Sequence, residues 1–254
     1  MYSLQDLKTR VIDKHIARQA IIKWHYSHTC PASLTLCVGT YYKDDLVNCI
    51  CFKNPTTRYM SQEVWEGGTD SNTIELVRMI SVEPKPKNLE SFCISRALNL
   101  LKEYCPQYKV CISYADNAMG HHGYCYQASN FVYYGQSGKS TVYVVNGERL
   151  HSKTIWERYG TNRWDKLVEM LGDSIKKEEI QETKSRYYKI IAQNKKEAKE
   201  IESKIKVKSY PYPKGDNEKY DYRFYGKFAK EQSKENELVN KQFIDVYNIF
   251  DSDE

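Results

Sequence analysis

Apolar residues recur along this chain in two patterns, one typical of strands and one typical of helices. Apolar or alternating runs predict strands over residues 34–42, 46–52, 74–82, 110–114, 132–134 and 141–145. Helical spacing predicts a helix over residues 11–28, with Val11, Ile12, Ala17, Ile21 and Ile22 facing inward. A second helix is predicted over residues 89–104, with Asn88 as its N-cap.

The order of these elements defines the fold class. After an initial helix come three strands, a helix, a strand, a further helical segment in which Tyr124, Ala128 and Phe131 recur, and more strands. This order predicts an α/β protein with a central mixed sheet flanked by helices. It is not a long alternation of strand and helix, and no glycine-rich phosphate loop is present, so a doubly wound dinucleotide fold is disfavoured.

The pattern changes in three places. Residues 54–72 are polar and are expected to form an irregular insertion. Residues 151–172 predict two short helices around Gly160, followed by a charged strand over 176–192 and a Lys/Glu-rich helix over 194–208. We expect one domain over residues 1–215, whose part from 150 onward is basic and contacts DNA, and a polar extension over 216–254.

Composition bounds the function only loosely. The 254 residues carry a net charge of +5, which permits binding to nucleic acid without establishing it. The 22 tyrosines suit stacking on bases, although an A+T-rich genome would supply them equally well. No signal peptide or membrane-spanning apolar run is visible, so we expect a cytoplasmic protein whose eight cysteines are free thiols. The Cys/His spacing does not predict a metal site.

Residues 114–135 carry the strongest chemical signal. Asp116, His121, His122 and Tyr126 stand where a predicted buried strand ends and a helix begins, which is the usual place for a site in an open α/β sheet. A solvated turn beside an inward-facing aromatic stripe would look the same. The residues alone therefore leave both interpretations open.

The strand over 74–82, the Pro-Lys loop after it and the next helix resemble the GCN5-related N-acyltransferase fold. That superfamily binds the pyrophosphate of its donor at this loop through a glycine-containing motif. Residues 82–91 contain no glycine, so the standard acetyl-CoA loop is absent.

Most of the chain, up to about residue 215, resembles the bacteriophage Mom family of DNA adenine-modifying proteins. The motifs that carry this resemblance are His25-Tyr26-Ser27, Glu75-Leu76-Val77-Arg78, Lys87-Asn88 with Ser91, Ser113–Asp116, Gly120-His121 and Tyr126–Ala128. The resemblance implies carbamoylmethylation of the adenine N6 amine in duplex DNA, which protects a phage genome from host restriction. The donor is unknown and could be acyl-CoA-like or glycine-derived.

The resemblance also implies catalytic roles for three residues. Asp116 would be the base that takes the N6 proton, and Tyr126 would protonate the leaving group. His25 could orient the base, bind the donor's carboxamide or relay a proton. The alternatives are a turn aspartate, an aromatic packed inward and a helix-capping histidine.

Further residues would bind the donor or the substrate. Arg78 lies on an apolar strand and needs an anionic partner, either a donor carboxylate, a DNA phosphate or an unrecognised salt bridge. Glu75 is a poor partner because it falls on the opposite face of a regular strand. The remaining residues assigned to this group are Ser27, Asn88, Ser91, Gln127 and His121.

Duplex DNA is the expected partner, together with a small-molecule donor. The target base must leave the stack to be reached, and phosphate contacts would supply most of the affinity. The predicted DNA-binding residues are Lys139, Arg149, Lys153, Arg158, Arg163, Lys184 and Arg186. Interspersed glutamates dilute this set, so a solvated face is the alternative. Two other functions stay open, an acyl-CoA-dependent N-acyltransferase and a non-catalytic DNA-binding antirestriction protein.

Overall fold

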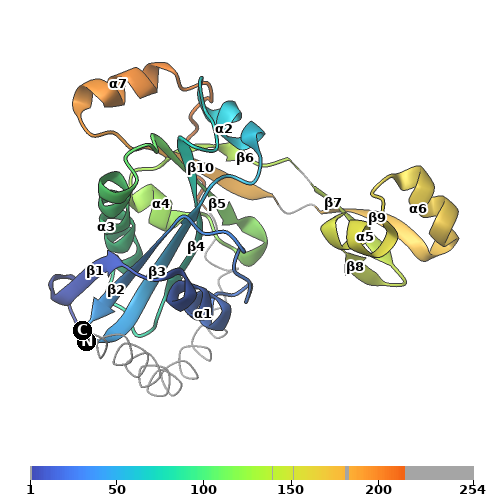
Figure 1. The fold of residues 1–254 in the computed structure, drawn as a ribbon, viewed down its shortest axis with the longest axis horizontal. Helices are drawn as coiled ribbons and strands as arrows, with labels where there is room; N and C mark the ends of the chain where they lie inside the picture. The colour runs from blue at the N-terminus through green and yellow to red at the C-terminus, as the bar shows by residue number, and fades with distance from the viewer. Residues whose placement is uncertain (1, 139, 151, 181–182, 215–254) are drawn as a thin grey trace, which may run out of the picture.

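Two separate sheets organise the chain in a computed structural model, which describes residues 2–138, 140–150, 152–180 and 183–214 (Figure 1). The larger sheet has seven strands in the order β1-β2-β3-β4-β5-β10-β6. Their bounds are β1 Leu7–Val11, β2 Leu36–Tyr42, β3 Asp45–Lys53, β4 Thr73–Ser81, β5 Val110–Asp116, β6 Val132–Gln136 and β10 Lys184–Ile190. Only β4 and β5 pair in parallel. The predicted mixed sheet is confirmed.

Helices cover both faces of this sheet. The helices of the body are α1 Lys14–Trp24, α2 Arg58–Val64, α3 Leu89–Tyr104, α4 Tyr124–Ala128 and α7 Lys195–Ser203. On β3, Ile50 packs in the cluster that contains α3, whereas Cys49 and Cys51 pack in the cluster that contains α1. Because alternate side chains of a strand point to opposite faces, burial on both faces explains why β3 is apolar from Leu46 to Phe52 except at Asn48.

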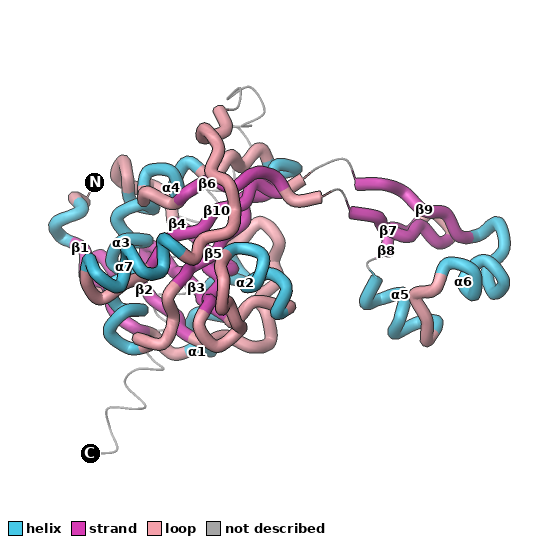
Figure 2. The backbone as a smooth tube through the Cα atoms, turned by 90° about the horizontal axis from the view of Figure 1, so that it is seen from above, coloured by secondary structure: helices cyan, strands magenta, loops and turns pink. Residues whose placement is uncertain are grey.

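A small arm projects from the body (Figures 1 and 2). It contains β7 Ser140–Val145, β8 Glu148–Leu150, α5 Ser152–Tyr159, α6 Trp164–Leu171 and β9 Ile175–Ile180. Its three strands pair in the order β8-β7-β9. The arm has its own apolar core, made by Val145, Leu150, Ile155, Leu167 and Ile175. In the chain it is inserted between β6 and β10, which are neighbours in the large sheet.

The parallel pair at the centre of the sheet separates part way along. Strands β4 and β5 are in register only from Thr73–Val110 to Leu76–Ser113. At the last pair, the Ser113 hydroxyl donates a hydrogen bond of 2.9 Å to the carbonyl of Leu76. Beyond it, β4 shifts register against β3, with one extra residue at Val77. Such a bulge bends a strand, so β4 leaves β5 and a gap opens between their ends.

The predicted start of the first helix, at residue 11, was wrong. Residues Leu7–Val11 form β1, and α1 starts only at Lys14, after the Asp13 side chain accepts a hydrogen bond from the backbone of His15. The alternation of Leu7, Thr9 and Val11 carried this strand signal. Ile22, predicted to face inward, is 46% exposed.

Other boundaries also differ. The supposedly irregular insertion contains α2, because Ser61 and Val64 bury one side of a short helix. Helix α4 ends at Ala128, so Phe131 is buried after the helix, following the left-handed Asn130. The charged strand predicted over 176–192 is divided between β9 and β10. The predicted extension over 216–254 lies outside the described residues.

Candidate active site

A cleft of about 650 Å³ opens where β4 and β5 separate. Several elements supply its walls: the segment after α1, the second half of β4, the end of β5, the loop before α4, and α4 itself. The predicted catalytic and donor-binding residues that line it are His25, Arg78, Asn88, Ser91, Asp116, His121 and Tyr126, and the predicted DNA contact Lys184 also lines it. The fold therefore brings together residues that lie up to 101 positions apart in the sequence, from 25 to 126.

His25 follows the last residue of α1 and is 7% exposed. Its Nδ1 lies 3.1 Å from the backbone N–H of Ser27 and 2.8 Å from the Ser27 hydroxyl. A backbone N–H can only donate, so Nδ1 is an acceptor and the neutral ring carries its proton on Nε2. Burial, with the nearby positive charge of Arg78, lowers the pKa of His25 to about 4. At neutral pH this side chain is thus a neutral hydrogen-bond donor.

His25 does cap α1, as one alternative predicted, but it does so through its backbone and not through its imidazole. Its N–H donates to the carbonyl of Ile21 at 2.9 Å, which closes the last turn of α1. The imidazole bonds instead to Ser27. Ser27 is not among the residues that line the cleft, and its place is beside His25. We therefore assign Ser27 to orienting the imidazole.

Tyr26 connects His25 to Asp116 and was missed as a site residue. Its hydroxyl donates to Oδ2 of Asp116 over a long 3.4 Å. Its ring lies 4.2 Å from the ring of His25 and packs edge-on against His121 at 5.4 Å. Burial lowers the pKa of His121, and the carboxylate of Asp116 opposes this effect. The signal that could have identified Tyr26 was its position inside the His-Tyr-Ser motif.

Arg78 presents a positive charge to the cleft. Its guanidinium donates to the carbonyl of Thr29 at 3.0 Å, to the Thr29 hydroxyl at 3.3 Å and to its neighbour's carbonyl at 2.9 Å. Within the described part of the chain no carboxylate forms an ion pair with it. Glu75 pairs instead with Lys53, at 2.9 Å. The guanidinium is oriented by neutral oxygens and retains its charge for an anionic ligand.

The loop before α3 is a poor place for a pyrophosphate. Pro84 and Pro86 have no N–H to donate, and the N–H of Lys85 donates to the carboxylate of Glu83. The Lys85 ammonium pairs with Glu83 at 2.8 Å and with Glu90 at 2.7 Å. Two carboxylates at the start of a helix repel the anion that this end would otherwise attract.

Asn88 and Ser91 stand at the same end of α3. Asn88 occupies the predicted N-cap position with a left-handed φ of 66°, but its side chain makes no capping hydrogen bond. Ser91 donates to the carbonyl of Asn88 at 3.1 Å. Both residues line the cleft, so the local role of Ser91 as a first-turn residue and its predicted role beside the donor are compatible.

Tyr126 is part of the core as well as of the cleft wall. It is 8% exposed, and its ring packs 5.5 Å from Phe131 and 5.4 Å from Tyr187. Burial raises the pKa of its hydroxyl far above the usual range, so the group stays protonated. Gln127 does not line the cleft; its amide donates to the carbonyls of His122 and Pro213, at 3.0 and 3.2 Å.

The predicted DNA contacts fall into three groups: one exposed lysine at the cleft, three arginines in ion pairs, and three residues whose side chains are not described. Lys184 is exposed at the edge of the cleft. Arg158 pairs with Glu148 at 2.8 Å, Arg163 with Asp165 at 2.6 Å and Arg186 with Glu63 at 2.5 Å. Lys139 lies outside the described residues, as do the side chains of Arg149 and Lys153.

Two further properties concern the described part of the chain. No group of three or more His, Cys, Asp or Glu residues there has the geometry to hold a metal ion. No helix there is long and apolar enough to cross a bilayer.

Known proteins of two kinds are similar to this chain. "Methylcarbamoylase mom" of Escherichia phage Mu is 31% identical over 154 residues, which are 61% of this chain and 64% of that protein. The match thus spans less than two thirds of the relative's length. In structure, the ribosomal-protein-S5-alanine acetyltransferase of Vibrio fischeri aligns with 76% of this chain and 97% of its own, at 10% identity and a TM-score of 0.42. A GNAT-family acetyltransferase of Streptococcus pneumoniae aligns with 73% and 99%, at 10% identity and a TM-score of 0.40.

The family assignment rests on nearly the whole described chain. The sequence pattern of the Mom protein family matches residues 6–214. This span includes every element that lines the cleft and the complete arm. The chain belongs to the Mom protein family.

Proposed function

We propose that this protein is a phage enzyme that transfers a small carbamoylmethyl-type group to the N6 amine of adenine in duplex DNA. The family assignment and the name of the phage Mu relative, a methylcarbamoylase, support this function. The observation that carries it is the meeting of Asp116, His25 and Arg78 in one cleft. These residues supply a base, a neutral hydrogen-bond donor and a positive charge.

Asp116 is the proposed base. The N6 lone pair is delocalised into the purine ring, so the amine must lose its proton as it attacks. The nitrogen forms a bond to the donor's carbon while the bond from that carbon to the leaving group breaks, and the leaving group departs with the electron pair. The N6 proton passes to the carboxylate of Asp116, where the Tyr26 hydroxyl already donates from 3.4 Å.

His25 and Arg78 are the proposed donor contacts. The Nε2–H of a neutral imidazole suits a carbonyl or carboxamide oxygen, and a bound donor that displaces water from the cleft gains more from such a bond than it would in water. The Arg78 guanidinium suits a carboxylate or a developing negative charge. Tyr126, which burial keeps protonated, is the proposed acid for the leaving group.

The target adenine has to leave the DNA stack to reach Asp116. Lys184 lies at the edge of the cleft, where a phosphate next to the extruded nucleotide would pass. The arm directly precedes Lys184 along the chain and is the proposed second DNA contact. The enzyme would act in the cytoplasm of the host cell and protect phage DNA from restriction.

The test is nucleoside analysis. The protein is expressed in bacteria, cellular DNA is digested, and the nucleosides are separated and identified by mass spectrometry beside those of cells with an empty vector. We expect a new deoxyadenosine derivative whose fragmentation places the added group on the base. An unchanged deoxyadenosine pool in cells that contain the folded protein would contradict the proposal.

A further inference from the structure

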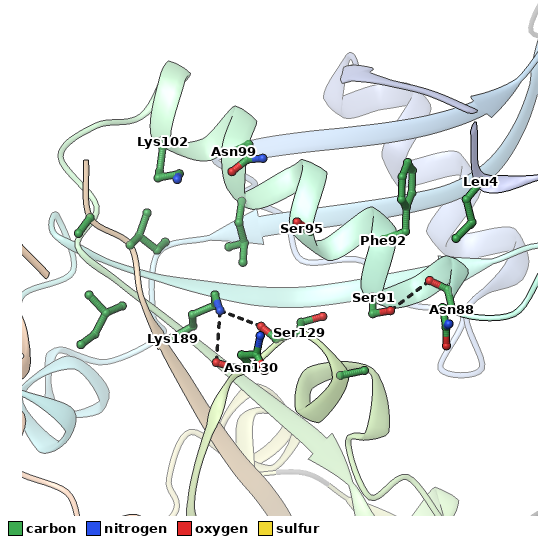
Figure 3. Close-up of a pocket in the computed structure, with 15 residues that line it drawn as sticks. Leu4, Asn88, Ser91, Phe92, Ser95, Asn99, Lys102, Ser129, Asn130 and Lys189 are labelled. Carbon is green, nitrogen blue, oxygen red and sulfur yellow. Dashed lines mark hydrogen bonds between the residues drawn. The ribbon is translucent and has the colours of Figure 1, made fainter. Parts of the chain in front are cut away.

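A second cavity, of about 480 Å³, continues from the cleft along α3 (Figure 3). Its walls are α3 on one side and, on the other, the turn after α4 together with the end of β10. Asn88, Ser91 and Ala128 line both this groove and the cleft. A ligand could therefore extend from the reacting atoms into the groove without leaving the protein surface.

The α3 wall of the groove is polar. Ser91, Ser95, Asn99 and Lys102 follow one another at intervals of four, four and three residues, which places them on one face of the helix. The same view shows them along the groove, with Lys102 at the end distant from Asn88 (Figure 3). Hydroxyl and amide groups in such a row can hydrogen-bond a neutral, elongated ligand along its length.

Two lysines share the groove. Lys189 lies across from α3, and its ammonium donates to the carbonyl of Ser129 at 2.8 Å and to that of Asn130 at 3.2 Å. Burial, together with the charge of Lys102, lowers the pKa of Lys189. Among the residues that the structure describes, no carboxylate forms an ion pair with either lysine. Two like charges in one groove, of which the Lys189 ammonium is held by two neutral carbonyl oxygens, favour an anion between them.

We propose that this groove binds the phosphate-bearing end of the group donor, with Lys102 and Lys189 on the phosphate and the reactive end beside Arg78. The assignment of the ligand as the donor rests on the proposed function. The start of α3 does not serve this purpose, because Glu83 and Glu90 occupy it. A small molecule fits better than DNA, since both overall views place α3 on the side of the body away from the arm (Figures 1 and 2).

The first test measures binding of inorganic pyrophosphate to the full-length protein by isothermal titration calorimetry at low salt. Lys102→Glu should weaken binding at least about tenfold, a loss of about 1.4 kcal/mol. The matched control is Arg96→Glu, which makes the same charge change on the same helix. Arg96 is exposed, packs over Phe92 and does not line the groove. It should change the affinity less than about twofold. No binding to the wild-type protein, or equal losses in the two variants, would overturn the proposal.

The second test examines whether the groove leads to the cleft. Ser95 is exposed midway along the groove, so Ser95→Trp should fill the passage without changing the charge. We expect this variant to bind pyrophosphate like the wild type and to lose the modified nucleoside in cells, with an unchanged unfolding temperature. Wild-type nucleoside levels in both Ser95→Trp and Lys102→Glu would show that the donor does not use the groove.

The outcomes separate this inference from the proposed function. Suppose that cells contain no modified nucleoside, but that pyrophosphate binds the wild-type protein and Lys102→Glu abolishes this binding. The proposed enzyme activity is then contradicted, whereas the anion site is supported. If a short DNA duplex displaces pyrophosphate from the wild-type protein, the groove belongs to the DNA surface and the small-molecule assignment is overturned.

Discussion

The chemical state of single side chains decides what the cleft can do. His25 would be an ordinary histidine at an exposed helix end, but burial and the charge of Arg78 lower its pKa to about 4. Its Nδ1 is engaged by Ser27, so only Nε2–H remains for a ligand. His25 is therefore a neutral hydrogen-bond donor to the cleft, and Asp116 remains the proposed base.

Two amide substitutions at His25 distinguish the roles of its two ring nitrogens. In His25→Asn the amide oxygen can replace Nδ1 as the acceptor for Ser27 but nothing replaces Nε2–H, so modification should fall by about 100-fold or more. In His25→Gln the longer side chain can replace Nε2–H and should retain more activity. Nucleoside analysis of matched cultures measures both. Higher activity in His25→Asn than in His25→Gln would contradict the assigned tautomer.

Burial of His25 also predicts a pH dependence of stability. Its pKa is about 4 in the folded protein and 6.5 for the ordinary side chain, so the unfolded chain binds the proton first as the pH falls. The free energy of unfolding therefore decreases as the pH falls from 6.5 to about 4. The total decrease is on the order of 3 kcal/mol once the pH is below both pKa values. Urea unfolding at pH 7.5 and 4 measures this loss.

The control for that measurement is on the same helix. His25→Gln should lose less stability on acidification than the wild type, whereas His15→Gln, at an exposed position of α1, should lose as much as the wild type. Equal acid sensitivity in all three proteins would show that His25 is not the responsible group.

Among the secondary-structure elements, strands β4 and β5 create the cleft, because their parallel pairing ends part way along. The sequence predicted β4, β5 and α3 nearly to the residue, because their apolar patterns and the helix-start signal at Asn88 are strong. It did not predict the bulge at Val77 or the length of the parallel ladder, since both depend on pairing with strands distant in sequence. It also missed β1, whose alternation merged with the helical pattern that follows.

Gly123 fixes the loop that carries His121. Its φ is +73°, and a Cβ there would lie 2.5 Å from the ring of Tyr187, whose hydroxyl in turn donates to the carbonyl of His122. Gly123→Ala should therefore displace the loop, lower activity strongly and destabilise the protein by about 2 kcal/mol. Thermal unfolding and nucleoside analysis test both effects.

Gly147 provides the matched control for Gly123. Its φ is +82°, but a Cβ there would meet no atom within 4 Å. Gly147→Ala should cost only the backbone strain, about 1 kcal/mol, and leave the cleft intact. If the two alanine variants behave alike, the contact with Tyr187 does not hold the loop.

At the scale of the whole molecule, a body that holds the cleft carries an arm with a core of its own. The sequence identified the short helices of the arm and its basic residues but not its independence, because the second sheet arises from pairing between β7 and β9, far apart in the chain. The ion pairs of Arg158 and Arg163 with nearby carboxylates reduce the positive charge that the composition suggested.

Removal of the arm should leave the body folded. Its two connections meet where the N–H of Ser137 donates to the carbonyl of Lys184 at 2.8 Å, so an Asn-Gly turn can replace residues 139–182. We expect cooperative unfolding and retained pyrophosphate binding, but weaker binding to duplex DNA with a shallower salt dependence. Fluorescence anisotropy with a labelled duplex measures this change. Unchanged DNA affinity would place the DNA contacts on the body alone.

The role of Asp116 as the base is tested most directly by comparing Asp116→Asn with Asp70→Asn. Both replace a carboxylate by an amide of the same shape, but Asp116 lines the cleft and Asp70 is exposed away from it. Digested DNA from cells that express each soluble variant is analysed for modified deoxyadenosine by mass spectrometry. We predict wild-type levels with Asp70→Asn and a loss of about 100-fold or more with Asp116→Asn. Modified deoxyadenosine at wild-type levels in Asp116→Asn would contradict the claim that this carboxylate removes the N6 proton.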